Sequence, residues 1–144
     1  MATRASRADT LTPNGKTPEL FSDFLNSFAK TPFGNQLGRV TNEQAVSQSI
    51  RNLILTMYGE RFFTPYVGAN VYNSLFELNT IVNTKSIELD IQNTIKNSEP
   101  RANIIQIDVV MDYQNENEIL INIVYNLINN INPINLSVVL KRVR

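Results

Sequence analysis

The spacing of the hydrophobic residues changes near residue 100, from a helical period to a period of two. Upstream, two stretches repeat apolar side chains three or four positions apart, which places them on one face of a helix. The first stretch contains Val46, Ile50, Leu53, Ile54 and Met57, and the second contains Ile87, Ile91 and Ile95. The pattern predicts one helix that begins at Thr41 and another over residues 84–97.

Flanking residues predict where the first helix begins and ends. Thr41 and Gln44 have the spacing of a capping box, and Gly59 stands where a C-cap glycine belongs. Residues 60–68 are then expected to form a loop that leads into a short helix over residues 71–77.

Downstream of residue 100, apolar and polar residues alternate as they do in strands with one buried face. The first strand is expected to turn inward Ile105, Ile107, Val109 and Met111. The second is expected to turn inward Ile119, Ile121, Ile123, Tyr125 and Leu127. Turns at residues 114–117 and 129–133 then lead to a third strand over residues 136–143. The predicted fold class is α+β, with N-terminal helices packed on a C-terminal three-stranded antiparallel meander.

The chain before residue 18 offers little to bury. Residues 1–17 mix Thr, Arg, Pro and Gly, and we expect a flexible N-terminal arm followed by a single domain over residues 18–144. The apolar segment from Phe21 to Phe28 is expected to pack on that domain as a short strand or turn. The aromatic loop over residues 60–68 is either a cap on the core or an exposed anchor. We interpret Phe62 as a cap on the core, because most aromatic clusters are buried, and leave interface contact open for Tyr66, which has a polar tip.

Composition narrows the classes of function. The 144 residues are 42% hydrophobic and 18% charged, as in a folded globular chain. Thirteen basic and 13 acidic side chains leave no net charge, which argues against a nucleic-acid-binding face. The absence of Cys and His removes thiolate nucleophiles, the Ser-His-Asp triad and most transition-metal sites, so we expect no cofactor and no metal. With no signal peptide and no apolar run of membrane-spanning length, we expect a soluble protein made in the cytoplasm, with no membrane partner.

The tripeptide Glu99-Pro100-Arg101 stands between the second helix pattern and the first strand. Proline lacks an N–H and pushes the preceding residue out of the helical region, so a stiff extended corner is expected. Arg101 would present a planar fork of donors suited to bidentate recognition of a carboxylate. One interpretation is a buried structural ion pair that joins helix to sheet, and the other is a site that recognises a partner.

Several motifs occur in an order that resembles one protein family. They are Phe21-Ser22-Asp23-Phe24, Gly59-Glu60-Arg61-Phe62, Pro65, Gly68, Leu75-Phe76-Glu77 and Glu99-Pro100-Arg101. Together they are similar to the small baseplate wedge proteins of T-even-type contractile phages, whose relatives include the type VI secretion component TssE. The resemblance covers roughly residues 18–144.

The resemblance implies a structural sheath initiator in the tail baseplate of a virion, assembled in the host cytoplasm. It implies that Glu99, Pro100 and Arg101 hold the helical core bundle of larger wedge proteins, with Gly59, Glu60 and Arg61 as a second partner-binding motif. It also implies that the tail sheath protein docks by adding strands to the sheet. We place that edge on the last strand, at Leu136, Val138 and Leu140, where β-augmentation would draw affinity from main-chain hydrogen bonds. Covering of the same edge by the N-terminal arm is the alternative.

Some members of this family carry a lysozyme label, so a peptidoglycan-cleaving enzyme is an alternative function. A glycosidase needs two carboxylates, one of them with a raised pKa, and Glu60 and Glu99 are the candidates. A neighbouring arginine that pairs with either carboxylate would lower its pKa, which is the wrong direction for a general acid. We therefore expect no catalytic residues and no enzymatic activity. A generic soluble adaptor domain is the remaining alternative.

Overall fold

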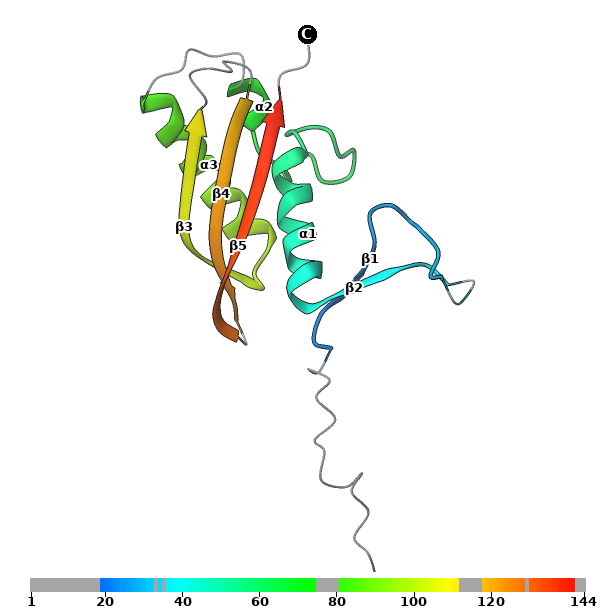
Figure 1. Cartoon of the computed structure of the whole chain (residues 1–144). Coiled ribbons are helices and arrows are strands. Elements are labelled where there is room, and N and C mark those ends of the chain that lie inside the picture. The colour runs from blue at the N-terminus through cyan, green and yellow to red at the C-terminus, as the bar shows by residue number, and fades with distance from the viewer. Residues whose placement is uncertain are drawn as a thin grey trace, which may run out of the picture.

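Three long strands form an antiparallel sheet in the order β3-β4-β5, and the helices lie against one of its faces (Figure 1). The strands are β3 (Ala102–Met111), β4 (Glu118–Leu127) and β5 (Asn130–Lys141). The helices are α1 (Asn42–Leu55), α2 (Val71–Ser74) and α3 (Ile81–Ser98). A separate ribbon of β1 (Ser22–Phe24) and β2 (Arg39–Thr41) extends sideways from the start of α1. The predicted α+β class with a three-stranded meander is confirmed.

The computed structural model describes residues 19–32, 34, 36–74, 81–111, 118–128 and 130–141. The predicted flexible arm of residues 1–17 and the turn at residues 114–117 lie outside these ranges. The end of the expected short helix, residues 75–77, also lies outside them.

The core fills the space between α1, α3 and the inner face of the sheet. The helices contribute Val46, Ile50, Ile54, Ile87, Ile91 and Ile95, and the central strand contributes Ile119, Ile121, Ile123, Tyr125 and Leu127. Full burial of one such aliphatic side chain stabilises a fold by about 1.5–3 kcal/mol. The predicted helical stripes and the predicted inward face of the second strand are confirmed, apart from Met57, which lies beyond the end of α1 and is exposed.

The start of α1 does not contain the predicted capping box. Thr41 is the N-cap residue, but its side chain makes no capping hydrogen bond. Asn42 instead adopts a positive φ of 48°, and its Oδ1 accepts the backbone N–H groups of Leu20 and Phe21 at 2.9 and 3.3 Å. The first turn of α1 is thus tied to the segment that leads into β1.

The prediction that Gly59 caps α1 is wrong. The helix ends at Leu55, and the C-cap residue Thr56 donates its backbone N–H and its side-chain hydroxyl to Asn52 O. Gly59 lies in the next loop with φ +84°, where its N–H donates to Pro65 O at 2.7 Å. The glycine is therefore used to close that loop rather than to end the helix.

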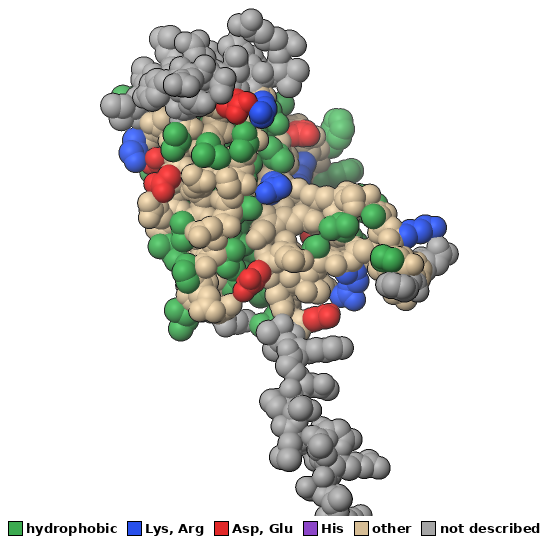
Figure 2. Space-filling model, in the orientation of Figure 1, with side chains coloured by type: hydrophobic (Ala, Val, Ile, Leu, Met, Phe, Trp, Pro, Cys, Tyr) green, Lys and Arg blue, Asp and Glu red, His purple; other side chains and the backbone are tan. Residues whose placement is uncertain are grey.

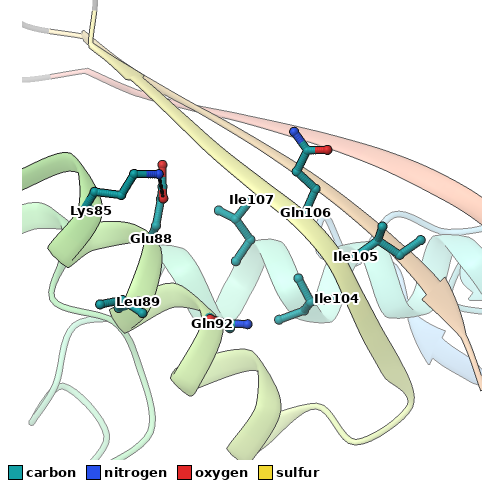
Figure 3. Close-up of a pocket in the computed structure, with 8 residues that line it drawn as sticks. All are labelled: Lys85, Glu88, Leu89, Gln92, Ile104, Ile105, Gln106 and Ile107. Atoms are coloured by element: carbon teal, nitrogen blue, oxygen red, sulfur yellow. Dashed lines mark hydrogen bonds and ion pairs between the residues drawn. The ribbon is translucent and has the colours of Figure 1, made fainter. Parts of the chain in front are cut away.

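A β-bulge changes the predicted pattern of β3. The pairing with β4 shifts register between Ile104 and Gln106, so that Ile105 is the extra residue. Ile105 is 58% exposed, which makes its predicted inward position wrong. Figure 3 shows Ile104 and Ile107 on the side of β3 that faces α3, with Gln106 on the opposite side.

The last strand begins earlier than predicted. β5 starts at Asn130 rather than Leu136 and includes Pro133. Because β5 is at the edge of the sheet and its pairing with β4 is irregular between Tyr125 and Leu127, a proline without an N–H is tolerated there.

Candidate functional site: the Glu99-Pro100-Arg101 corner and its cleft

The chain turns from α3 into β3 at the Glu99-Pro100-Arg101 corner. The Glu99 N–H donates to Ile95 O at 2.8 Å and completes the last helical turn. Pro100 cannot continue that pattern because it has no N–H. Ala102 then donates its N–H to Glu99 O at 3.2 Å, and β3 begins. The chain leaves the helix at the tripeptide as predicted, but through a hydrogen-bonded turn rather than the extended corner that the sequence predicts.

Arg101 binds the carboxylate of Glu99 with two donors. Its Nε lies 2.5 Å from Glu99 Oε1 and its Nη2 lies 2.6 Å from Oε2. The Ser49 hydroxyl of α1 also donates to Oε2 at 2.5 Å. The other side of the guanidinium lies over the ring of Phe21, with Cζ 5.5 Å from the ring centroid. One ion pair thus joins α1, α3, β3 and the segment before β1.

Burial and hydrogen bonding act in opposite directions on the Glu99 carboxyl. The side chain is 3% exposed, and this burial, the largest single influence, raises its pKa. The hydrogen bonds from Arg101 and Ser49 together outweigh it, so the pKa of Glu99 lies below its ordinary value. The hydrogen bond to Glu99 in turn raises the pKa of Arg101. Glu99 is held as an anion, whereas a general acid needs a raised pKa.

A cleft of about 660 Å³ opens beside this corner. Its walls come from β1, α1, the loop over residues 60–68 and the end of α3. They are formed by Asp23, Ser49, Asn52, Leu53, Arg61, Thr64, Tyr66, Val67, Asn97 and Ser98. Ser49 lines the cleft and also bonds Glu99, so one wall residue of the cleft is shared with the ion pair. Residues from three sequence motifs that are far apart in the chain, Asp23, Arg61 and Glu99, thus meet in one region.

The loop over residues 60–68 presents aromatic side chains to solvent. Phe62 is 97% exposed and Phe63 is 99% exposed, so the interpretation of Phe62 as a core cap is wrong. Tyr66, 76% exposed, lines the cleft. Within the described ranges Glu60 does not pair with Arg61, and its Oε2 accepts the Met57 N–H at 3.0 Å.

The last strand is an edge of the sheet, as predicted. Leu136, Val138 and Leu140 are buried, with their side chains in the core. Arg51 Nη2 of α1 donates to Ser137 O at 3.3 Å. Because the N–H and C=O of one residue in an antiparallel strand point to the same side, this bond indicates that Ser137 faces the free edge. The backbone N–H and C=O groups of Leu136 and Val138 then face β4. The residues whose backbone groups face the free edge are therefore those between the predicted edge residues Leu136, Val138 and Leu140.

A second, smaller cavity lies between α3 and β3 (Figure 3). It measures about 220 Å³ and has apolar walls at Leu89, Ile104 and Ile107, with a Lys85–Glu88 ion pair of 2.6 Å at its edge. It contains none of the motif residues. Within the described part of the chain, no cluster of carboxylates could hold a metal ion, and no helix has the length and apolar character to cross a membrane.

Ser49 is the residue of this site that the sequence pattern did not single out. It lies on α1 between the buried positions Val46 and Leu53, and it bonds Glu99 from 50 residues away. A serine inside a helix beside a buried stripe is a weak signal of a buried polar partner. That signal was present, but it does not identify the partner.

Comparisons with known proteins give a family match from the sequence and similar folds among solved structures. Residues 40–131 match the family described as "Baseplate wedge protein gp25". The chain is 25% identical over 112 residues to baseplate wedge protein gp25 of Enterobacteria phage T4, which covers 78% of this chain and 83% of that protein. The fold is similar to a Geobacter sulfurreducens protein proposed to be a tail lysozyme, with a TM-score of 0.66, 22% identity, and coverage of 73% of this chain and 95% of that one. It is also similar to a chain of the anti-feeding prophage baseplate, with a TM-score of 0.60, 21% identity, and coverage of 84% and 85%.

Proposed function

The chain belongs to the baseplate wedge protein gp25 family, and we propose that it anchors to larger wedge proteins through the Glu99-Pro100-Arg101 corner in the baseplate of a contractile tail. The family match over residues 40–131 carries this proposal, because it includes α1, the loop over residues 60–68 and the corner. The location that follows is the tail baseplate of a virion.

The geometry of the corner supports a role in binding. Pro100 is exposed and the Arg101 side chain is 34% exposed, while Glu99, itself held by the Ser49 hydroxyl, binds the guanidinium from the inside. A guanidinium that is already oriented loses little conformational freedom when it binds a partner. The adjoining cleft has both polar and apolar walls, a composition that suits side chains of a partner helix.

The free edge of β5 is the proposed docking place for the tail sheath protein. Leu136, Val138 and Leu140 anchor the strand in the core, and the backbone groups of the alternating residues around Ser137 would accept a strand from the sheath. In the free chain, the Arg51 side chain donates a hydrogen bond to the Ser137 carbonyl oxygen, so an added strand would have to replace that bond.

Two variants test the corner together. Arg101→Ala is expected to weaken co-assembly with the larger wedge proteins by more than its loss of folding stability explains. Ser47→Ala is the matched control on the same helix, because it removes the 2.6 Å hydrogen bond between Ser47 and Tyr125, worth about 0.5–1.5 kcal/mol, and Ser47 does not line the cleft. It should lower the melting temperature and retain co-assembly. If the two variants lose binding in proportion to their melting temperatures, the corner is a structural ion pair only.

Lack of hydrolytic activity is part of the same proposal. Glu99 is 2% exposed and its pKa is lowered, and both properties oppose the role of a general acid. Purified chain is expected to leave suspensions of cell walls turbid. Clearing of the suspension that disappears in Glu99→Gln or Glu60→Gln would show an enzyme instead.

A further inference from the structure

The Phe62-Phe63 pair has the most exposed large hydrophobic side chains in the described part of the chain, at 97% and 99%. Hydrophobic side chains protrude at the upper right of Figure 2, where Figure 1 places the loop between α1 and α2. Scattered exposed apolar residues are ordinary, but two adjacent phenylalanines on one loop form an apolar tip.

This loop is held by hydrogen bonds at several points. Gly59 N–H donates to Pro65 O at 2.7 Å, and Ala69 N–H donates to Thr56 O at 2.9 Å, which closes the base of the loop. The Thr94 hydroxyl of α3 donates to Gly68 O at 2.9 Å. The loop is therefore pre-organised, although the fold gains no burial from Phe62 and Phe63. A binding role accounts for this combination, because ordering a loop in advance lowers the entropy cost of association.

The Phe62-Phe63 pair lies in the chain between residues that line the cleft described above. Arg61, Thr64 and Tyr66 of the same loop line that cleft, so the loop has one side toward the cleft and bears the phenylalanines between those residues. A protein seated in the cleft would reach the apolar tip without leaving the surface of this chain. The exposed guanidinium of Arg61 is next to the tip in sequence, and it favours an acidic group at the edge of the partner's surface.

We infer that Phe62 and Phe63 insert into an apolar pocket with an acidic rim on the same larger wedge protein that occupies the cleft. This inference rests on the proposed function and adds a second contact to it. The tip is the hydrophobic anchor of the interface, and the Glu99-Pro100-Arg101 corner is its polar part.

Photo-crosslinking in assembled particles tests the inference. Benzoylphenylalanine is placed at position 62 or 63, at position 97 in the cleft wall, and at position 131 as a control that is also highly exposed, at 91%. We expect positions 62, 63 and 97 to crosslink to the same larger wedge protein and position 131 not to do so. Crosslinks from position 97 alone, or from 62 and 63 to the sheath or to a second copy of this chain, overturn the inference and leave the proposed function standing. A lack of crosslinks from position 97 to any wedge protein contradicts the proposed function itself.

A variant supplies a second readout. Because both side chains are exposed, Phe62→Ser with Phe63→Ser should leave the melting temperature of the free chain unchanged. Binding to the wedge protein recovered in the crosslink should weaken on the order of 30-fold or more, as expected for interface anchors. Ile131→Ser is the matched control, with melting temperature and wedge binding both unchanged. Retained affinity of the double variant overturns the inference.

Discussion

At the scale of single residues, the chain keeps a buried carboxylate charged by surrounding it with fixed donors. Burial of Glu99 opposes its ionisation, and the guanidinium of Arg101 with the hydroxyl of Ser49 restores it. The pairing of Glu99 with Arg101 could be predicted from sequence, because the two residues are two positions apart at a proline corner. The contribution of Ser49 could not, because it depends on how α1 packs against the end of α3.

The lowered pKa of Glu99 predicts acid sensitivity. Its contribution to stability is fully present above the ordinary pKa of 4.5 and is lost as the pH falls through the lower pKa of the folded state, where the carboxylate is protonated. In Glu99→Gln this contribution is absent at every pH. Denaturant unfolding between pH 7 and pH 2 should therefore show a stability gap between the two proteins that narrows in acid. A gap that stays constant would mean that the carboxylate charge does not contribute.

Substitution of Gly59 and of Gly68, both between α1 and α2, is expected to lower the stability of the fold by unequal amounts. A Cβ on Gly68 would lie 2.6 Å from the backbone oxygen of Thr56, and its φ is +142°. Gly59 also has a positive φ, of +84°, but nothing lies within 4 Å of an added Cβ. Gly59→Ala should cost about 1–2 kcal/mol, the strain of a left-handed residue. Gly68→Ala should cost clearly more, because backbone must move. Thermal unfolding of both variants measures the difference, and equal costs would contradict the close approach at Gly68.

At the scale of elements, hydrophobic period predicts helices and central strands well and edge strands less well. β4 is flanked on both sides and has one buried face, so its alternation holds over its full length. β3 and β5 are edge strands, and each departs from a strict alternation, at the bulge of Ile105 and around Pro133. A sequence pattern that assumes an unbroken period of two places Ile105 inward, because it contains no signal for the extra residue.

The side to which each backbone N–H group of β5 points predicts different effects for proline substitutions at two neighbouring residues. Val138→Pro removes an N–H that faces β4 and disturbs a side chain that is 4% exposed, so it should prevent stable folding. Ser137→Pro removes an N–H on the free edge, so the chain should stay folded and lose sheath docking. Circular dichroism of the free chains and sheath polymerisation on isolated baseplates measure the two effects. Normal sheath assembly on the Ser137→Pro variant would show that sheath strands do not use this edge.

At the scale of the whole molecule, the core depends little on the β1–β2 ribbon. The buried core residues lie between Val46 and Leu140, and the family match begins at residue 40. The ribbon contacts the body through hydrogen bonds such as Gln48 Nε2 to Phe24 O at 2.7 Å, and the residue before it, Phe21, is partly buried against the core.

A chain that begins at Gly38 is therefore expected to fold. It loses the contact between Phe21 and Arg101, worth about 0.5–1 kcal/mol, together with part of the burial of Phe21. We expect one cooperative thermal transition at a moderately lower temperature, with the far-ultraviolet signal of the helices retained. A broad transition without cooperativity would show that the ribbon is part of the folding unit.

The bulge at Ile105 also makes the two edges of the sheet unequal. Both outer strands contain one irregularity, β3 at Ile105 and β5 around Pro133, but the unbroken run of β5, from Ile134 to Lys141, is longer than that of β3, from Gln106 to Met111. Interrupted borders resist pairing with another chain. If the sheath protein adds strands to this sheet as proposed, β5 offers it the longer continuous row of backbone groups. The bulge, although it adds nothing to the core, would then bias the first sheath strands toward one edge of the sheet.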